Sequence, residues 1–147
     1  MQKIKIEKMQ FGDIPYVAEL DKQSISESWS EQNYKESLEN PNYIILVAKT
    51  EDKIIGFISM YCATDEGYIC NIAVEKSYRK CGIGTSLMNE IITFSKDKDL
   101  KFLTLEVRES NTNAIKFYKK LNFTNLGIRK NFYSNPAENS VIMTLYF

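Results

Sequence analysis

The chain has 147 residues, of which 44% are hydrophobic and 26% are charged, and its 19 basic side chains balance 19 acidic ones. This length and composition are typical of an ordinary globular protein with a real core, so we expect residues 1–147 to form a single domain. A net charge of zero excludes the basic balance that favours nucleic-acid or anionic-membrane partners, and no apolar run is long enough to span a bilayer.

Residue types that are scarce also narrow the chemistry. The chain has no histidine, which excludes a Ser-His-Asp or Cys-His catalytic unit and a His-ligated metal. Proton transfer in an enzyme of this sequence must therefore use Glu, Asp, Tyr, Lys, Cys or water. Cys62, Cys70 and Cys81 are odd in number and lack CxxC spacing, so neither a disulfide framework nor a zinc site is expected. Without a signal-peptide pattern at its start, the chain is expected in the reducing cytoplasm.

The first half of the chain predicts one strand, two helices and three further strands. Alternating apolar and charged residues predict a strand near residues 3–9. Asp13 is an N-cap candidate for a helix that reaches about Gln23, and Ser30 is one for a short helix through Leu38. The next expected strands are residues 43–49, 53–62 and 66–74. Short polar turns separate them, which predicts an antiparallel meander.

The second half predicts two helices and three strands. A helix follows the glycine-containing segment 78–84 and reaches about Lys96, and a second helix spans about residues 111–121. The expected strands are residues 102–108, 124–130 and 139–146. The resulting order, β-α-α-β-β-β-α-β-α-β-β, indicates an α+β domain with helices layered on a central mixed, mostly antiparallel sheet. The strands at 66–74 and 102–108, joined through a helix, should run parallel.

The segment YRKCGIG, residues 78–84, has the composition of an anion-binding loop. Gly82 and Gly84 allow close approach of a ligand to the backbone, and the first N–H groups of the following helix attract negative charge. Arg79 and Lys80 add positive charge, although a capped loop with two solvated cations is the simpler alternative. A Walker A loop requires a lysine after Gly84, and a dinucleotide fingerprint requires glycine where Leu87 stands, so both classes are excluded.

The same loop carries a family resemblance. Residues 79–84 match the [RQ]-x-x-G-x-[GA] signature of the GNAT superfamily of N-acetyltransferases, whose element order is the one predicted above. The chain more narrowly resembles the RimI type through N-I-A-V at 71–74, L-E-V-R at 105–108, S-N at 110–111 and A-I-x-x-Y-x-x-x-x-F at 114–123. This resemblance covers essentially the whole chain. It implies the GNAT fold, acetyl-CoA as co-substrate, and an N-terminal alanine of a small-subunit ribosomal protein as acceptor.

The resemblance also implies how the donor is held. Backbone N–H groups of residues 80–85 would bind the pyrophosphate of acetyl-CoA, and the strand at 72–74 would pair with the pantetheine arm. The implied cofactor-binding residues are Ile72, Ala73, Val74, Arg79, Lys80, Cys81, Gly82, Ile83, Gly84, Thr85 and Asn111. From the residues alone, the apolar strand is equally a buried core strand, and Asn111 is the expected N-cap of its helix.

Glu106 and Tyr118 are the implied catalytic pair. A lone glutamate in an alternating strand is otherwise a surface residue, and Tyr118 on an apolar helix face is otherwise a core aromatic. By resemblance, Glu106 accepts the proton of the amine, directly or through water, and Tyr118 protonates the leaving thiolate. Partial burial would raise the pKa of Glu106 and make it a better base near neutrality. Cys81 beside basic residues is a conceivable nucleophile, but its position in the signature is variable.

The acceptor side is implied to include Trp29, Arg129 and Tyr133. The chain departs from the RimI pattern at Ser28, where proline is usual, and at Asn139, where an acidic residue is usual. The alternatives are an N-acetyltransferase of another peptide or small amine, and a non-catalytic acyl-CoA-binding module, against which the retained acid–base pair argues. No nucleic-acid, membrane or metal partner is predicted, and the oligomeric state is left between a monomer and a weak dimer.

Overall fold

The computed structural model describes residues 3–24 and 28–147. The elements follow the predicted order and differ from the predicted bounds by a few residues at most. They are β1 (Lys5–Lys8), α1 (Ile14–Ser24), α2 (Glu31–Glu39), β2 (Tyr43–Lys49), β3 (Ile54–Ala63), β4 (Glu66–Val74), α3 (Ile83–Asp97), β5 (Phe102–Arg108), α4 (Thr112–Lys120), β6 (Thr124–Ser134) and β7 (Ala137–Tyr146). Two short 3-10 turns precede α1 and α3. None of the helices in the described ranges is long and apolar enough to cross a membrane.

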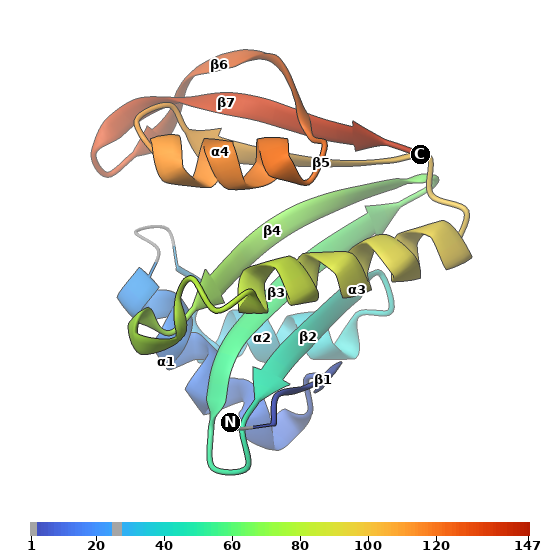
Figure 1. Cartoon of the computed structure of the whole chain (residues 1–147), viewed down its shortest axis with the longest axis vertical. Coiled ribbons are helices and arrows are strands. Elements are labelled where there is room, and N and C mark those ends of the chain that lie inside the picture. The colour runs from blue at the N-terminus through green and yellow to red at the C-terminus, as the bar shows by residue number, and fades with distance from the viewer. Residues whose placement is uncertain (1–2, 25–27) are drawn as a thin grey trace.

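Seven strands form one sheet in the order β1-β2-β3-β4-β5-β7-β6 (Figure 1). Every neighbouring pair is antiparallel except β4 and β5, so the predicted mixed, mostly antiparallel sheet is confirmed. The expected meander is β2-β3-β4. The predicted parallel pair is β4 and β5, in which residues 66–68 pair with residues 102–104.

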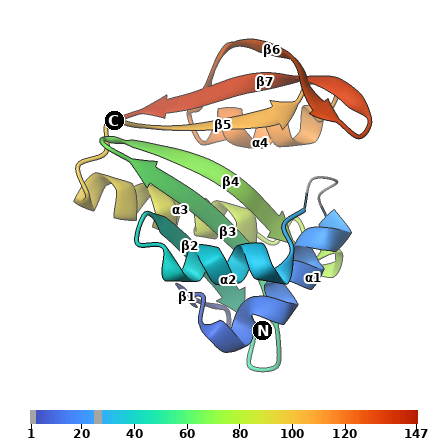
Figure 2. The same ribbon diagram turned by 180° about the vertical axis from the view of Figure 1, so that it is seen from behind.

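Helices cover both faces of the sheet, which creates two cores. Figures 1 and 2 show α3 and α4 on one face and α1 and α2 on the other. Within β3, Phe57 packs in the core under α1 and α2, whereas Ile58 packs in the core under α3 and α4. Strands buried on both faces read as continuous apolar runs, which explains the unbroken Ile-Ile-Leu-Val-Ala of β2.

Asp13 has a different role from the expected one. Its carboxylate does not cap α1 in the described structure but accepts a hydrogen bond from the Gln10 N–H at 2.8 Å, within the 3-10 turn that precedes the helix. It also lies 2.9 Å from Lys49 Nζ at the end of β2. The expected caps at Ser30 and Asn111 are confirmed, because each side chain accepts a backbone N–H three residues later.

The last two strands are longer than predicted. They were expected at residues 124–130 and 139–146, but pairing continues to Ser134 and Ala137. The register shifts between Asn125 and Gly127 and between Arg129 and Tyr133, so extra residues bulge out of the ladder. These bulges hide the alternation on which strand prediction depends. Consequently Tyr133 lies in a strand and not in a loop.

Candidate active site

A groove opens where β4 and β5 separate. The two parallel strands pair over only three positions, ending at Tyr68 and Thr104 (Figure 1). Beyond them, residues 69–74 of β4 and residues 105–108 of β5 line opposite sides of an open groove of about 1680 Å³. Past Tyr68, β4 therefore presents a backbone edge without a neighbouring strand on that side. An extended ligand can hydrogen bond to such an edge in the way a strand does.

The glycine-containing loop forms one end of this groove. Gly82 is the N-cap of α3 and has a φ of 80°, a left-handed conformation that glycine adopts without steric cost. Lys80 also has a positive φ, 64°. Left-handed residues in a turn can point neighbouring N–H groups in one direction, so this loop and the helix N-terminus have the geometry of a candidate anion site. Lys80, Gly82 and residues 83–85 line the groove.

Side chains around the loop hold it in place. Arg79 Nε donates to the Val74 carbonyl at 3.1 Å, which joins the loop to the end of β4. Ile83 is buried in the core, and a side chain at Gly84 would contact the Phe117 ring of α4 at 3.4 Å. Cys81 is exposed and is not among the residues that line the groove, in contrast to the other members of the predicted loop.

The predicted strand 72–74 lies along the groove, behind an irregularity in β4. Asn71 pairs with Ser59 and Ile69 with Met60, so Cys70 has no partner in β3. The Ser59 hydroxyl accepts the Asn71 N–H at 3.1 Å and so replaces the missing ladder contact. A bulge of this kind changes the direction in which the following residues face. Ala73 then packs under α1 and α2, and Ile72 and Val74 pack toward α3.

Glu106 reaches the groove from the α1 and α2 face of the sheet. Its neighbours Leu105 and Val107 are buried in the core of the opposite face, so the alternation of a strand turns Glu106 away from them. Its carboxylate lies 2.9 Å from Arg129 Nη1 and its side chain is 5% exposed. Ser140 Oγ donates to it at 3.5 Å. Burial raises the pKa of Glu106, and the Arg129 guanidinium and Ser140 oppose that rise.

Tyr118 reaches the groove from the other face. Its ring belongs to the core under α3 and α4 and lies 5.7 Å from the Phe123 ring, between centroids. The residue is 7% exposed and also lines the groove, so the core and groove positions are compatible. Burial, with a smaller effect of Tyr133, raises the pKa of the Tyr118 hydroxyl. The hydroxyl therefore keeps its proton at neutral pH and is available as a donor.

The three predicted acceptor-side residues have different places. Trp29 and Tyr133 line the groove. Arg129 forms an ion pair with Glu106, the predicted base, and is not among the residues that line the groove. Tyr133 lies under the Arg108 guanidinium, 4.3 Å from its ring centroid. Arg108 also donates to the carbonyls of Asn135 and Pro136, which holds the turn between β6 and β7 beside the groove.

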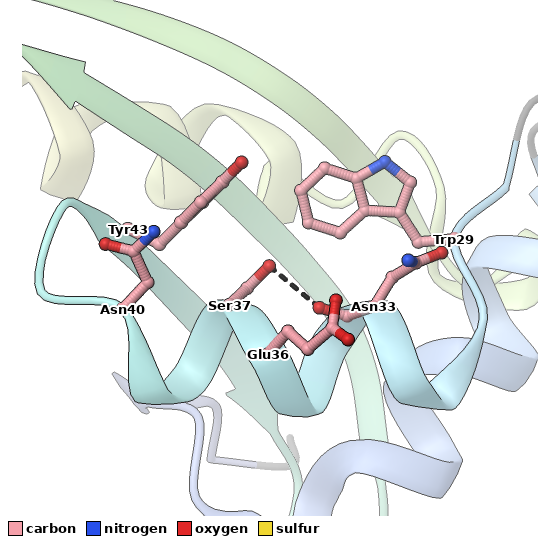
Figure 3. Close-up of a pocket in the computed structure, with 6 residues that line it drawn as sticks. All are labelled: Trp29, Asn33, Glu36, Ser37, Asn40 and Tyr43. Carbon is pink, nitrogen blue, oxygen red and sulfur yellow. Dashed lines mark hydrogen bonds between the residues drawn. The ribbon is translucent and has the colours of Figure 1, made fainter.

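A smaller hollow of about 320 Å³ adjoins the groove at α2 (Figure 3). Trp29 and Tyr43 line both spaces, with their ring centroids 5.8 Å apart. The remaining lining residues are polar side chains of the second helix and its end, Asn33, Glu36, Ser37 and Asn40. The groove therefore continues past two aromatic rings onto a polar surface.

Sequence reasoning missed several groove residues. Tyr68 stands at the last paired position of β4, and Asn71 stands at the bulge. Burial, with a smaller effect of the nearby Glu106, raises the pKa of Tyr68 to about 12. The polar Asn71 within an apolar strand was an available signal. Asn111 was predicted, and it both caps α4 and lines the groove.

The sequence of the chain is similar to known acetyltransferases. Residues 14–123 match the model of the Acetyltransferase (GNAT) family. The chain is 34% identical over 144 residues to the [ribosomal protein bS18]-alanine N-acetyltransferase of Haemophilus influenzae, covering 96% of this chain and 97% of that protein.

Solved structures support the same relationship. The crystal structure of the ribosomal-protein-S18-alanine N-acetyltransferase from Escherichia coli matches with a TM-score of 0.89 and 27% identity, covering 98% of this chain and 94% of that one. A GNAT family acetyltransferase from Elizabethkingia anophelis with acetyl-CoA bound matches with a TM-score of 0.82 and 25% identity, covering 98% of each chain. The chain therefore belongs to the acetyltransferase (GNAT) family, and it is an acetyl-CoA-dependent N-acetyltransferase.

Proposed function

We propose that this protein acetylates the N-terminal α-amino group of a protein, and that its acceptor is the N-terminal alanine of ribosomal protein bS18. The observation that carries the proposal is the groove between β4 and β5, which receives Glu106 from one face of the sheet and Tyr118 from the other. Full-length relatives named as bS18-alanine N-acetyltransferases support the choice of acceptor.

The residues of the groove fit the donor. Acetyl-CoA carries phosphates at one end and an extended arm with amide groups at the other. The candidate anion site at Lys80 and Gly82 suits the pyrophosphate, and the unpaired edge of β4 at residues 72–74 suits the arm. Asn111 and the positively charged Arg79 and Lys80 also border this space. When bound there, acetyl-CoA supplies the activated acetyl group.

Glu106 removes the proton that makes the acceptor unreactive. A free α-amino group has a pKa of about 7.7–8.0 and is mostly an ammonium ion at neutral pH. Burial raises the pKa of Glu106 above the ordinary value, which strengthens it as a base, while the charge of Arg129 beside it favours the carboxylate form. The neutral amine then has the lone pair needed for attack on a thioester.

Tyr118 serves the leaving group. Departure of coenzyme A leaves a thiolate, and a hydroxyl that keeps its proton can donate to it. Tyr118 is buried and lines the groove from the α4 side, opposite Glu106. The acid and the base thus act on two sides of one acetyl transfer, and the absence of histidine in the chain is accounted for.

The acceptor enters on the α1 and α2 side. Trp29 lies there beside Tyr43, and Tyr133 approaches from the β6–β7 turn held by Arg108. Aromatic walls of this kind give contact area to an extended peptide at little conformational cost.

The test is acetylation of a synthetic peptide with the N-terminal sequence of bS18, beginning with alanine, followed by intact mass and thiol release. We expect one acetyl group on the α-amine and none on the same peptide with a blocked N-terminus. A lysine-containing peptide with a blocked α-amine and a panel of small amines complete the comparison. Turnover only on small amines would contradict the proposed acceptor, and binding of acetyl-CoA without any turnover would contradict the catalytic roles.

A further inference from the structure

A buried carboxylate outside the proposed chemistry joins three elements behind the groove. Asp21 of α1 is fully buried, at 0% exposure. Its Oδ2 atom accepts hydrogen bonds from the Trp29 backbone N–H at 3.0 Å and from the Tyr34 hydroxyl at 2.5 Å. A third hydrogen bond comes from Asn71 Nδ2 at 3.2 Å. We call Asp21, Tyr34 and Asn71 the Asp21 cluster.

Burying the Asp21 carboxylate costs free energy, and its three hydrogen-bond donors offset that cost. Isolated buried charges are strongly unfavourable, and stability requires that hydrogen bonds satisfy them. Burial raises the pKa of Asp21, while the hydrogen bonds from Tyr34, Trp29 and Asn71 lower it. An apolar residue would fill the same position on the helix without this cost. The position is therefore better explained by the geometry that Asp21 imposes than by packing.

Each of the three hydrogen-bond donors lines the groove or contacts a residue that lines it. Trp29 and Asn71 line the groove themselves. The Tyr34 ring lies 5.2 Å from the Trp29 ring, between centroids, and contacts Phe57 edge to face. One oxygen atom thus joins Trp29, Tyr34 of α2 and Asn71 at the bulge of β4.

Only one of the two carboxylate oxygens is used in this way. Oδ1 of Asp21 is buried and has no hydrogen-bond partner among the described residues. A side-chain amide can therefore keep all three contacts with its oxygen at the Oδ2 position. Alanine keeps none of them and leaves three donors without their acceptor, which is a larger loss.

We propose that Asp21 is a positioning residue that sets the acceptor-side wall of the groove by fixing Trp29 and Asn71. The proposal rests on the acceptor side assigned under the proposed function. The donor loop and Asn111 lie at the starts of α3 and α4, on the opposite face of the sheet, and β4 is the element that both sides share, so loss of Asp21 weakens acceptor binding more than donor binding.

Kinetics with two substrates test this division. In Asp21→Ala we expect the KM for the Ala-starting peptide to rise about tenfold, with the KM for acetyl-CoA within about twofold of wild type. Asp21→Asn restores most of the peptide KM because its amide oxygen retains the three contacts. Tyr34→Phe, which removes one donor and keeps the ring, gives a smaller rise. Equal changes in both KM values, or no change in Asp21→Ala, would overturn the proposal.

A second measurement does not depend on activity. Trp29 is the single tryptophan of the chain, so its fluorescence reports on this wall alone. We expect acrylamide to quench Trp29 more efficiently in Asp21→Ala than in wild type and in Asp21→Asn. Unchanged quenching in a folded Asp21→Ala protein would contradict the proposal. If the wild-type enzyme acetylates no N-terminal peptide, the proposed function fails while the quenching result still decides the role of Asp21.

The matched control is Ser95→Ala. Ser95 is also fully buried and polar, and its hydroxyl donates to the Ile91 carbonyl at 2.7 Å within α3, away from the groove lining. The Ser95→Ala variant shows how a general loss of stability changes the KM values and Trp29 quenching. In Ser95→Ala we expect a lowered melting temperature. The KM for the peptide and the KM for acetyl-CoA should not change relative to one another, and Trp29 quenching should stay as in wild type. The same KM pattern in Ser95→Ala as in Asp21→Ala would overturn a specific role for Asp21.

Discussion

Arg129 Nη1 lies 2.9 Å from Glu106 Oε1, although β7 separates their strands in the sheet. The contact places the Arg129 guanidinium beside the carboxylate of Glu106, the proposed base. It gives Glu106 two opposed influences, because burial favours the neutral acid and Arg129 favours the carboxylate.

Replacing Arg129 with glutamine should shift the pH dependence of catalysis. Glu106 acts as a base only when it is deprotonated, so activity falls as the pH falls through its pKa. Loss of the cation raises that pKa further, and the acidic limb of the kcat/KM profile moves to higher pH. Arg129→Lys keeps the charge and should give a profile nearer to wild type. The profiles are measured by thiol release across pH, and an unmoved acidic limb in Arg129→Gln would show that Glu106 is not the titrating base.

Removing either proposed catalytic group, Glu106 or Tyr118, should lower turnover strongly. We expect Glu106→Gln and Tyr118→Phe each to reduce kcat by about 100-fold or more, the usual scale of general acid–base catalysis. Neither change removes a ring or a chain carbon, so the fold should persist. Rates at saturating acetyl-CoA, with circular dichroism as the control for folding, provide the measurement. Near wild-type turnover in both variants would mean that the roles are misassigned.

Gly67 should be intolerant of a side chain at the point where β4 and β5 pair. A Cβ atom there would lie 2.6 Å from Leu103 Cδ2 and 2.8 Å from Met60 Sδ, well inside contact distance. Gly67→Ala should lower the free energy of unfolding by about 1–3 kcal/mol, the usual cost of overpacking. Gly12→Ala is the matched control, since a Cβ there meets nothing within 4 Å. Urea denaturation of both variants tests this, and equal stabilities would contradict the packing at the junction.

Glu138 should make the β6–β7 turn sensitive to acid. Its carboxylate accepts the Ser110 N–H at 2.6 Å and pairs with Arg108 at 3.1 Å. Hydrogen bonds from Ser110, with a smaller effect of Arg108, lower the pKa of Glu138 in the folded protein. The stabilisation is therefore present above the unfolded-state pKa and is lost as the pH falls through the folded-state pKa. Wild type should be more stable than Glu138→Gln at pH 7 and should converge with it in acid, as thermal unfolding can show.

The sequence predicted features that depend on local pattern. The strand expected at residues 102–108 alternates as predicted, with Leu105 and Val107 buried and Glu106 between them, and a loop precedes α3 where the glycine spacing predicted one. Contacts made through bulges could not be predicted, because an inserted residue near Gly127 reverses the face of the sheet toward which the following side chains point. The contact between Arg129 and Glu106 is of this kind.

Asp21 is already unusual in the sequence. It lies one helical turn after Val17, on the buried stripe of α1, where a charge is unusual. Its partners Tyr34 and Asn71 are 13 and 50 residues away in the chain, so the anomaly could be noticed while its explanation required the fold.

The short pairing of β4 with β5 has a consequence for stability as well as for catalysis. Three paired positions join the two parts of the sheet, and the open edge beyond them lacks a neighbour. If acetyl-CoA binds along this edge, as proposed, it acts as a temporary strand beside β4. Its binding free energy then adds to the stability of the folded chain, by about 2.7 kcal/mol at a concentration 100 times Kd. The enzyme would thus be most resistant to unfolding when it is loaded with its donor.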